Sequence, residues 1–194
     1  MFEGIKDVND EDLILSSDLD EIPDLKSFKF KNKITLFQQN VFYYKFNLMQ
    51  PNFKWMGTRA CKKKQLKEFQ WLRNIKSKSY PFWRVDTLFS NLKHMNLQIV
   101  EDGGWHFTNI KTAKDIYTKL SNFGHHNEFD VSGISVEDIQ KCIDNKIVNY
   151  NHQADMSVKN KYNANYKLKL IEDKNLPNYL IKNKQKYKDW FSNS

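Results

Sequence analysis

The strongest constraint on this chain lies near its start, where a short apolar run is followed at once by acidic residues and a proline. Leu13-Ile14-Leu15 is typical of a buried strand. Asp18, Asp20 and Glu21 come next, and Pro23 ends further strand pairing because it has no N–H to donate. In an extended backbone Asp18 and Asp20 point to the same side, and Glu21 points to the other. The sequence therefore predicts two carboxylates at the carboxyl end of a strand, where open α/β sheets bind ligands.

This pair of carboxylates predicts a metal site. Carboxylates separated by one residue can hold a hard divalent cation such as Mg²⁺ or Mn²⁺. A cation in this position could neutralise a diphosphate leaving group by Lewis-acid catalysis. The simpler alternative is an acidic, solvated turn after a strand.

Composition excludes several classes of protein. The 194 residues include only six glycines, about half the usual frequency, and contain neither a GxGxxG nor a GxxxxGK[ST] motif. No apolar run is long enough to span a bilayer, and the mean hydropathy is −0.75. The first residues lack the apolar core of a signal peptide, and Cys61 and Cys142 are too few for a disulfide framework. These features favour a cytoplasmic location without a transmembrane segment.

The net charge of +8 suggests a nucleic-acid partner, but the kind of basic residue argues against one. Of the 31 basic residues 28 are Lys, and only Arg59, Arg73 and Arg84 carry the guanidinium that nucleic-acid interfaces favour. We therefore expect no nucleic-acid partner.

The hydrophobic pattern predicts a mixture of strands and helices. Strands are expected at 13–15, within 34–48, at 97–100 and at 105–110, and helices within 24–30, 65–75, 87–95 and 111–123. Ser135 and Asp138 resemble a capping box that opens a further helix. No repeat or linker is visible, so residues 1–194 are expected to form a single α/β domain.

The segment 17–23, Ser-Asp-Leu-Asp-Glu-Ile-Pro, resembles the DxDEIP signature of glycosyltransferase family 17. Further stretches resemble other motifs of that family in the same order, so the resemblance covers nearly the whole chain. These stretches are Phe42-Tyr43-Tyr44, Trp55-Met56-Gly57-Thr58, Gly104-Trp105-His106-Phe107, Lys119 with Phe123 and His126-Asn127-Glu128, and Leu176-Pro177-Asn178-Tyr179-Leu180.

The resemblance implies the C-terminal part of a GT-A-like nucleotide-sugar transferase domain, with a mixed sheet flanked by helices. Complete members of the family carry a substantial region before the DxDEIP box, so the resemblance implies a domain that is truncated at its N-terminus. A separate chain could supply the missing region. It also implies a metal-dependent, inverting transfer of a sugar from a UDP-sugar to a glycan acceptor. N-acetylglucosamine is the expected sugar, because the family is known for its role in protein N-linked glycosylation.

The same resemblance assigns roles to individual residues. Asp18 and Asp20 are the expected ligands of Mn²⁺ or Mg²⁺, and Glu21 and Lys119 are expected to help bind the nucleotide sugar. Substrate contacts are expected from Trp105, His106 and His126, although the spacing also allows His125 as the family histidine. The expected general base is Glu128, and Asp130 and Asp102 remain alternatives.

Two other functions fit parts of this pattern. An inactive fragment or pseudoenzyme that binds glycan or a partner chain would keep the fold without the transfer. A phosphatase of the haloacid dehalogenase type also places a DxD motif after an apolar strand, but Ile22 stands where Thr or Val is usual.

Overall fold

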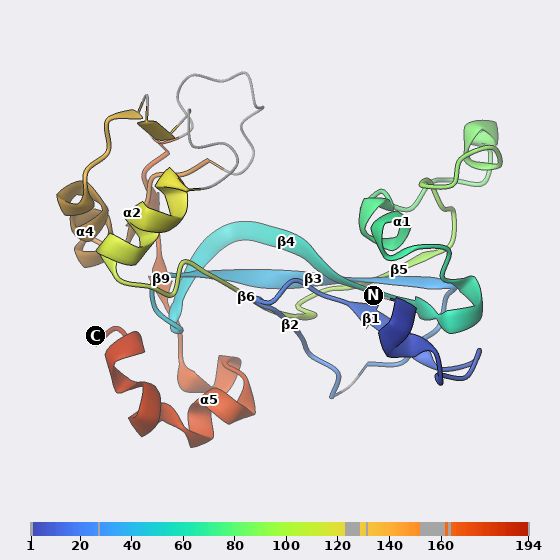
Figure 1. Cartoon of the computed structure of the whole chain (residues 1–194), viewed down its shortest axis with the longest axis horizontal. Coiled ribbons are helices and arrows are strands. Elements are labelled where there is room, and N and C mark those ends of the chain that lie inside the picture. The colour runs from blue at the N-terminus through green and yellow to red at the C-terminus, as the bar shows by residue number, and fades with distance from the viewer. Residues whose placement is uncertain are drawn as a thin grey trace. The chain divides into compact units, whose positions relative to one another are not determined.

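The computed structural model describes residues 2–26, 28–122, 129–130, 132–151, 162 and 164–193, and it shows a mixed α/β fold (Figure 1). The main sheet has seven strands, in the order β1-β4-β3-β6-β2, with β5 pairing with β3 and β9 with β4. These strands are β1 (Leu13–Ser16), β2 (Glu21–Pro23), β3 (Ile34–Tyr43), β4 (Leu48–Lys62), β5 (Leu97–Val100), β6 (Gly104–Thr108) and β9 (Lys169–Leu170).

Short helices and a two-stranded sheet accompany the main sheet. The small sheet pairs β7 (Ile147–Val148) with β8 (Tyr166–Lys167). The α-helices are α1 (Phe69–Asn74), α2 (Ala113–Ser121), α4 (Val136–Asp144) and α5 (Asn178–Lys182), and the 3₁₀ helices are η1 (Phe2–Ile5), η2 (Lys63–Gln65), η3 (Val85–Thr87), η4 (Asp173–Asn175) and η5 (Lys184–Trp190). In the described part of the chain, every helix is too short or too polar to cross a bilayer.

The chain divides into two compact units. Unit 1 comprises Met1–Asn40 and Lys54–His106, and unit 2 comprises Val41–Phe53 and Phe107–Ser194. The long strands β3 and β4 contribute residues to both units.

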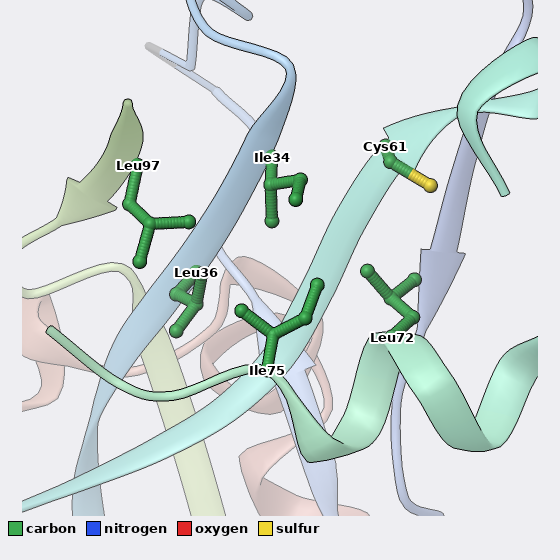
Figure 2. Close-up of a cluster of buried hydrophobic side chains, with 6 residues drawn as sticks. All are labelled: Ile34, Leu36, Cys61, Leu72, Ile75 and Leu97. Carbon is green, nitrogen blue, oxygen red and sulfur yellow. The ribbon is translucent and has the colours of Figure 1, made fainter. Parts of the chain in front are cut away.

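Unit 1 has its own apolar core, between the sheet and α1. Figure 2 shows the side chains of this core, which are Ile34, Leu36, Cys61, Leu72, Ile75 and Leu97. They come from β3, β4, α1 and its C-terminal end, and β5, and each is less than 9% exposed. This core therefore fixes α1 on β3, β4 and β5, and β4 also pairs with β1, the strand that leads to the acidic turn.

Unit 2 is built around aromatic side chains and two amphipathic helices. Phe46 packs against Phe107 and Phe191 at ring-centroid distances of 5.3 and 5.8 Å. Helix α2 packs against α4, which begins with the expected capping box: Ser135 Oγ accepts from the Asp138 N–H, and the Asp138 carboxylate accepts from the Ser135 N–H.

The expected strands and several expected helices are present, but two expected helices are not. The described residues within 24–30 are not helical, and 88–95 form turns after the 3₁₀ helix η3. The hydroxyl of Ser90 accepts hydrogen bonds from the N–H groups of Leu92 and Lys93. A serine side chain that captures these backbone donors competes with helix formation, which explains why the helix expected at 87–95 is absent.

Candidate active site

The acidic segment forms a tight turn between β1 and β2. Strand β1 pairs antiparallel with β4 as far as Ser16, opposite Arg59, and the chain then reverses. The Glu21 N–H donates to the Asp18 carbonyl at 3.1 Å, and the Asp18 N–H donates to Glu21 Oε2 at 3.0 Å. Glu21 was expected to point away from Asp18 and Asp20 if the strand continued; it does not continue, and the Glu21 side chain turns back to the backbone of Asp18.

Glu21 holds this turn against the sheet. Its side chain is buried, with the residue 9% exposed, and its Oε1 accepts a hydrogen bond of 2.8 Å from Trp55 Nε1. Strand β2 pairs antiparallel with β6, which places Glu21 opposite His106 and Ile22 opposite Trp105. Both carboxylate oxygens of Glu21 thus bind groups of this chain, so we assign it to positioning the turn.

The two aspartates of the turn have different partners. Asp18 faces Arg73 of α1, whose Nη2 lies 2.9 Å from Asp18 Oδ2 and whose Nη1 contacts Oδ1. Asp20 Oδ2 lies 3.4 Å from His106 Nε2 on β6. Each aspartate side chain is 41% exposed, so both carboxylates can be reached from solvent.

His106 and Trp55 connect Asp20 to the interior of unit 1. Their rings pack with centroids 5.1 Å apart and planes inclined by 38°. His106 is 8% exposed, and its Nδ1 is buried without a hydrogen-bond partner in the described part of the chain. The imidazole therefore presents Nε2 to Asp20, and its other face of contact is the indole of Trp55.

A pocket of about 270 Å³ opens beside the turn. Its walls come from the end of β1, the turn, β4 and α1. The lining residues are Ser16, Asp18, Glu21, Trp55, Met56, Gly57, Arg59, Gln70, Arg73 and Asn74. The volume lies just below the ~300–1,000 Å³ typical of sites for drug-sized ligands, so it suits a small ligand or one portion of a larger one.

Gly57 is required where β4 passes the turn. A Cβ at this position would lie 2.0 Å from Gln39 Oε1 and 3.0 Å from Glu21 Cδ. Gln39 is fully buried and donates to Thr58 Oγ1 at 3.2 Å, and Thr58 in turn shares a 2.6 Å hydrogen bond with Ser17. The lack of a side chain at Gly57 therefore lets this buried polar network and Glu21 approach the strand.

Arg59 supplies a second cation to the pocket. Its Nη1 donates to the carbonyls of Leu72 and Ile75, at 3.1 and 2.7 Å, at the C-terminal end of α1. Burial lowers the pKa of its guanidinium, and the nearby carboxylate of Glu21 opposes this effect. Its hydrogen bonds to carbonyls leave its charge intact, so the pocket lining holds the guanidinium groups of Arg59 and Arg73 beside the carboxylates of Asp18 and Glu21.

Of the other candidates from the sequence, those that the structure describes do not line this pocket. Trp105 is half-buried on β6 and does not line the pocket, and Lys119 belongs to unit 2, where its Nζ donates to Asn109 Oδ1 at 2.9 Å. Asp102 pairs with Lys54, which lowers the pKa of its carboxyl and weakens it as a base. Asp130 lies in unit 2, and His125, His126 and Glu128 lie outside the described residues.

Sequence reasoning assigned no role to three residues that line the pocket: Arg59, Arg73 and Trp55. A usable signal was present in the composition, because a chain with 28 lysines has only three arginines, and two of these line one pocket. Arginine binds carboxylates and phosphates with a planar, two-pronged geometry that lysine lacks. Rare arginines in a lysine-rich chain were therefore better site candidates than its lysine clusters.

Comparisons with family models, with curated proteins and with solved structures found no match to this chain. The described residues contain no group of three or more His, Cys, Asp or Glu side chains that could hold a metal ion. The site is therefore defined by its own geometry: a small pocket lined by Asp18, two arginines and an indole, with Asp20 and His106 in contact beside it but not among its lining residues.

Proposed function

We propose that this chain is a metal-dependent glycosyltransferase that moves a sugar, with N-acetylglucosamine as the first candidate, from a UDP-sugar to a glycan acceptor. One observation carries the proposal. The turn with Asp18 and Asp20 and the strand with His106 are adjacent, and a pocket containing two arginines opens beside the turn. The mixed sheet is compatible with a GT-A-like nucleotide-sugar domain, which forms part of the proposal.

We propose that the carboxylates of the turn hold a hard divalent cation. Asp20 and Asp18 offer accessible carboxylate oxygens, and Mg²⁺ commonly uses one or two carboxylates together with substrate phosphates and water. An ion bound by these two residues would offset the negative charge that develops on a diphosphate leaving group. A metal ion at Asp18 would have to share this carboxylate with Arg73, which contacts both of its oxygens.

The arginines account for recognition of an anionic ligand. Arg59 is fixed by backbone carbonyls, and Arg73 is held by a partly exposed carboxylate that a phosphate can replace. Trp55 adds an indole to the same wall, against which a sugar or base ring can pack. We propose that the diphosphate lies between the arginines and the acidic turn, in place of part of the Arg73–Asp18 contact.

An inverting transfer also requires a base at the acceptor hydroxyl. We keep Glu128 as the proposed base, since the pairing of Asp102 with Lys54 makes that carboxylate a poorer candidate. Asp130 remains the alternative from the same part of the sequence.

The test is binding and turnover of a panel of UDP-sugars, with and without Mn²⁺. Calorimetry should show UDP binding that depends on Mn²⁺, and one UDP-sugar should be hydrolysed or transferred. Asp20→Asn and Arg73→Lys should each weaken UDP binding at least about tenfold, as expected when a charge-assisted or two-pronged contact is lost. Unchanged UDP binding in both variants would contradict the proposal.

Arg84→Lys is the matched control. It makes the same chemical change at the third arginine, which pairs with Asp86 away from the pocket. UDP binding should be unaffected by this substitution. An equal loss in Arg84→Lys and Arg73→Lys would show that the pocket is not where UDP binds.

The Arg73–Asp18 pair also favours a second candidate, a pseudoenzyme that binds the nucleotide or a glycan without transferring sugar. In that case the guanidinium would permanently satisfy Asp18. UDP binding that is independent of Mn²⁺, without release of sugar, would favour this second candidate.

A further inference from the structure

The segment that connects α1 to β5 exposes an unusual set of apolar side chains. Within the eight residues 82–89, five large hydrophobic residues are between 62% and 88% exposed. They are Phe82, Trp83, Val85, Leu88 and Phe89. Figure 1 shows this segment in green, standing away from the helix α1 that precedes it. We call residues 80–89 the aromatic loop.

The aromatic loop is a folded structure. Its flanks are joined by hydrogen bonds from the Lys76 N–H to the Leu92 carbonyl (2.8 Å) and from Ser79 Oγ to the Met95 carbonyl (2.6 Å). At its centre, the 3₁₀ helix η3 buries Thr87, whose Oγ1 donates to the Arg84 carbonyl at 2.6 Å. The Phe82 and Trp83 rings pack edge to face, with centroids 5.2 Å apart. The exposed side chains are therefore presented by a defined scaffold.

Basic side chains gather around Tyr80, at the N-terminal end of this loop. The Tyr80 ring has three cations near it, with Lys78 Nζ at 5.3 Å, Arg84 Cζ at 5.7 Å and Lys93 Nζ at 5.9 Å from the ring centroid. We call Lys78, Arg84 and Lys93 the basic collar. Asp86 is the one acidic residue in 76–95, against four basic residues, and it pairs with both Arg84 and Lys93. Residues 76–95 thus carry a formal charge of +3.

Exposed apolar side chains and basic side chains in one short segment are the two kinds of group that an anionic membrane surface attracts. Trp, Phe and Leu partition into the boundary between headgroups and acyl chains, and Lys and Arg are attracted to anionic headgroups. A second copy of this chain fits the surface less well, because facing copies would bring two basic collars together. The charge therefore favours a lipid surface over self-association.

We propose that the aromatic loop is a peripheral membrane-binding element that inserts Phe82, Trp83, Leu88 and Phe89 into the interface of an anionic bilayer. The basic collar contacts the headgroups. The proposal does not depend on the function of the pocket, since none of the collar or loop residues line it.

The experiment is co-sedimentation of the full chain with vesicles of phosphatidylcholine, with and without phosphatidylglycerol. Binding should require phosphatidylglycerol and weaken as salt is raised.

The triple substitution F82S/W83S/F89S should reduce binding at least about tenfold, because three large side chains no longer enter the interface. Its thermal unfolding should match that of the unsubstituted chain, since all three side chains are exposed. Tyr179→Ser removes an exposed aromatic residue outside the loop and should have no effect on binding.

A charge-matched pair of variants tests the collar. K78E/K93E should abolish binding to anionic vesicles, whereas K141E/K174E, which changes the net charge equally at two exposed lysines, should reduce it much less. Equal losses in the two variants would show that net charge alone drives binding and would overturn the proposal.

Fluorescence quenching by brominated lipid tests the insertion itself. Binding should quench tryptophan emission, and Trp83→Phe should remove most of this quenching while binding persists. Two outcomes would overturn the proposal. One is quenching that survives in Trp83→Phe. The other is that the protein binds neither kind of vesicle and instead forms a dimer, which the F82S/W83S/F89S substitution dissociates.

Discussion

Arg73 Nη2 lies 2.9 Å from Asp18 Oδ2, and its Nη1 contacts the other carboxylate oxygen, so the two residues form a two-pronged ion pair at the mouth of the pocket. The pair joins the turn after β1 to α1, and both side chains are nearly half exposed. An exposed pair of this kind is easily exchanged for a ligand, because water already competes for both partners.

This pair should contribute little to folding. A double-mutant cycle with Asp18→Asn and Arg73→Met, measured by urea unfolding, should give a coupling free energy of about 0.2–1 kcal/mol. A coupling of several kcal/mol would identify the pair as structural and would weaken the proposal that a phosphate displaces it.

Glu21 should matter much more for stability than the aspartates beside it. Glu21→Gln replaces one acceptor oxygen by an amide donor, which then faces either the Asp18 N–H or the indole N–H of Trp55. Leaving such a buried group unsatisfied costs about 1–3 kcal/mol. Urea unfolding should show this loss in Glu21→Gln, while the same change at the exposed Glu101 should have almost no effect.

Gly104 should tolerate no side chain. Its φ is +138°, and a Cβ would lie 2.1 Å from the Ile22 carbonyl oxygen, so alanine would force β2 away from β6. We expect Gly104→Ala to cost more than about 3 kcal/mol, since strain and overpacking add. Gly4→Ala, where the added Cβ meets nothing within 4 Å, is the control and should leave the unfolding midpoint unchanged.

Glu11 should make stability depend on pH in the acid range. Hydrogen bonds from Lys62 and Lys64 lower the pKa of its carboxyl from an ordinary 4.5 to about 2. Because the folded pKa is the lower one, the stabilisation is complete above pH 4.5 and is lost as the pH falls toward 2. Thermal unfolding of Glu11→Gln should therefore lie below that of the unsubstituted chain at pH 7, with the gap closing toward pH 2 and shrinking in high salt. A gap that persists at pH 2 would contradict this account.

Leu72 should be a determinant of the unit 1 core. It is fully buried in α1 among Ile34, Cys61 and Ile75, and Leu72→Ala should cost about 2–5 kcal/mol through lost burial and the cavity left behind (Figure 2). Leu88→Ala makes the same change at a residue that is 69% exposed and should alter the free energy of unfolding by less than about 0.5 kcal/mol.

Elements governed by local pattern were predictable from the sequence. The structure contains the strands expected at 13–15, 97–100 and 105–110. It also contains the helix expected within 111–123 and the Ser135 capping box. Each depends on residues within a few positions of one another, so periodicity and capping chemistry suffice. The helix expected at 87–95 is absent because the Ser90 hydroxyl accepts the N–H bonds of Leu92 and Lys93.

The contacts of the acidic segment could not be predicted from local sequence pattern alone. Its position directly after a strand and its grouping of carboxylates were visible in the sequence. The partner of each carboxylate was not, because Arg73, Trp55 and His106 approach from three elements far along the chain. The reversal between Asp18 and Glu21 also removed the side-to-side alternation from which the orientation of Glu21 was inferred.

By itself, then, the sequence determined the mixed α/β class, the positions of β1, β3, β5 and β6, and the carboxylates near the start as candidates for chemistry. Only the tertiary structure decided that Asp18 faces a guanidinium, that Asp20 faces an imidazole and that Glu21 is buried beneath an indole. The physical reason is that strand pairing and the packing of α1 set these contacts, and both join residues separated by tens of positions in the chain.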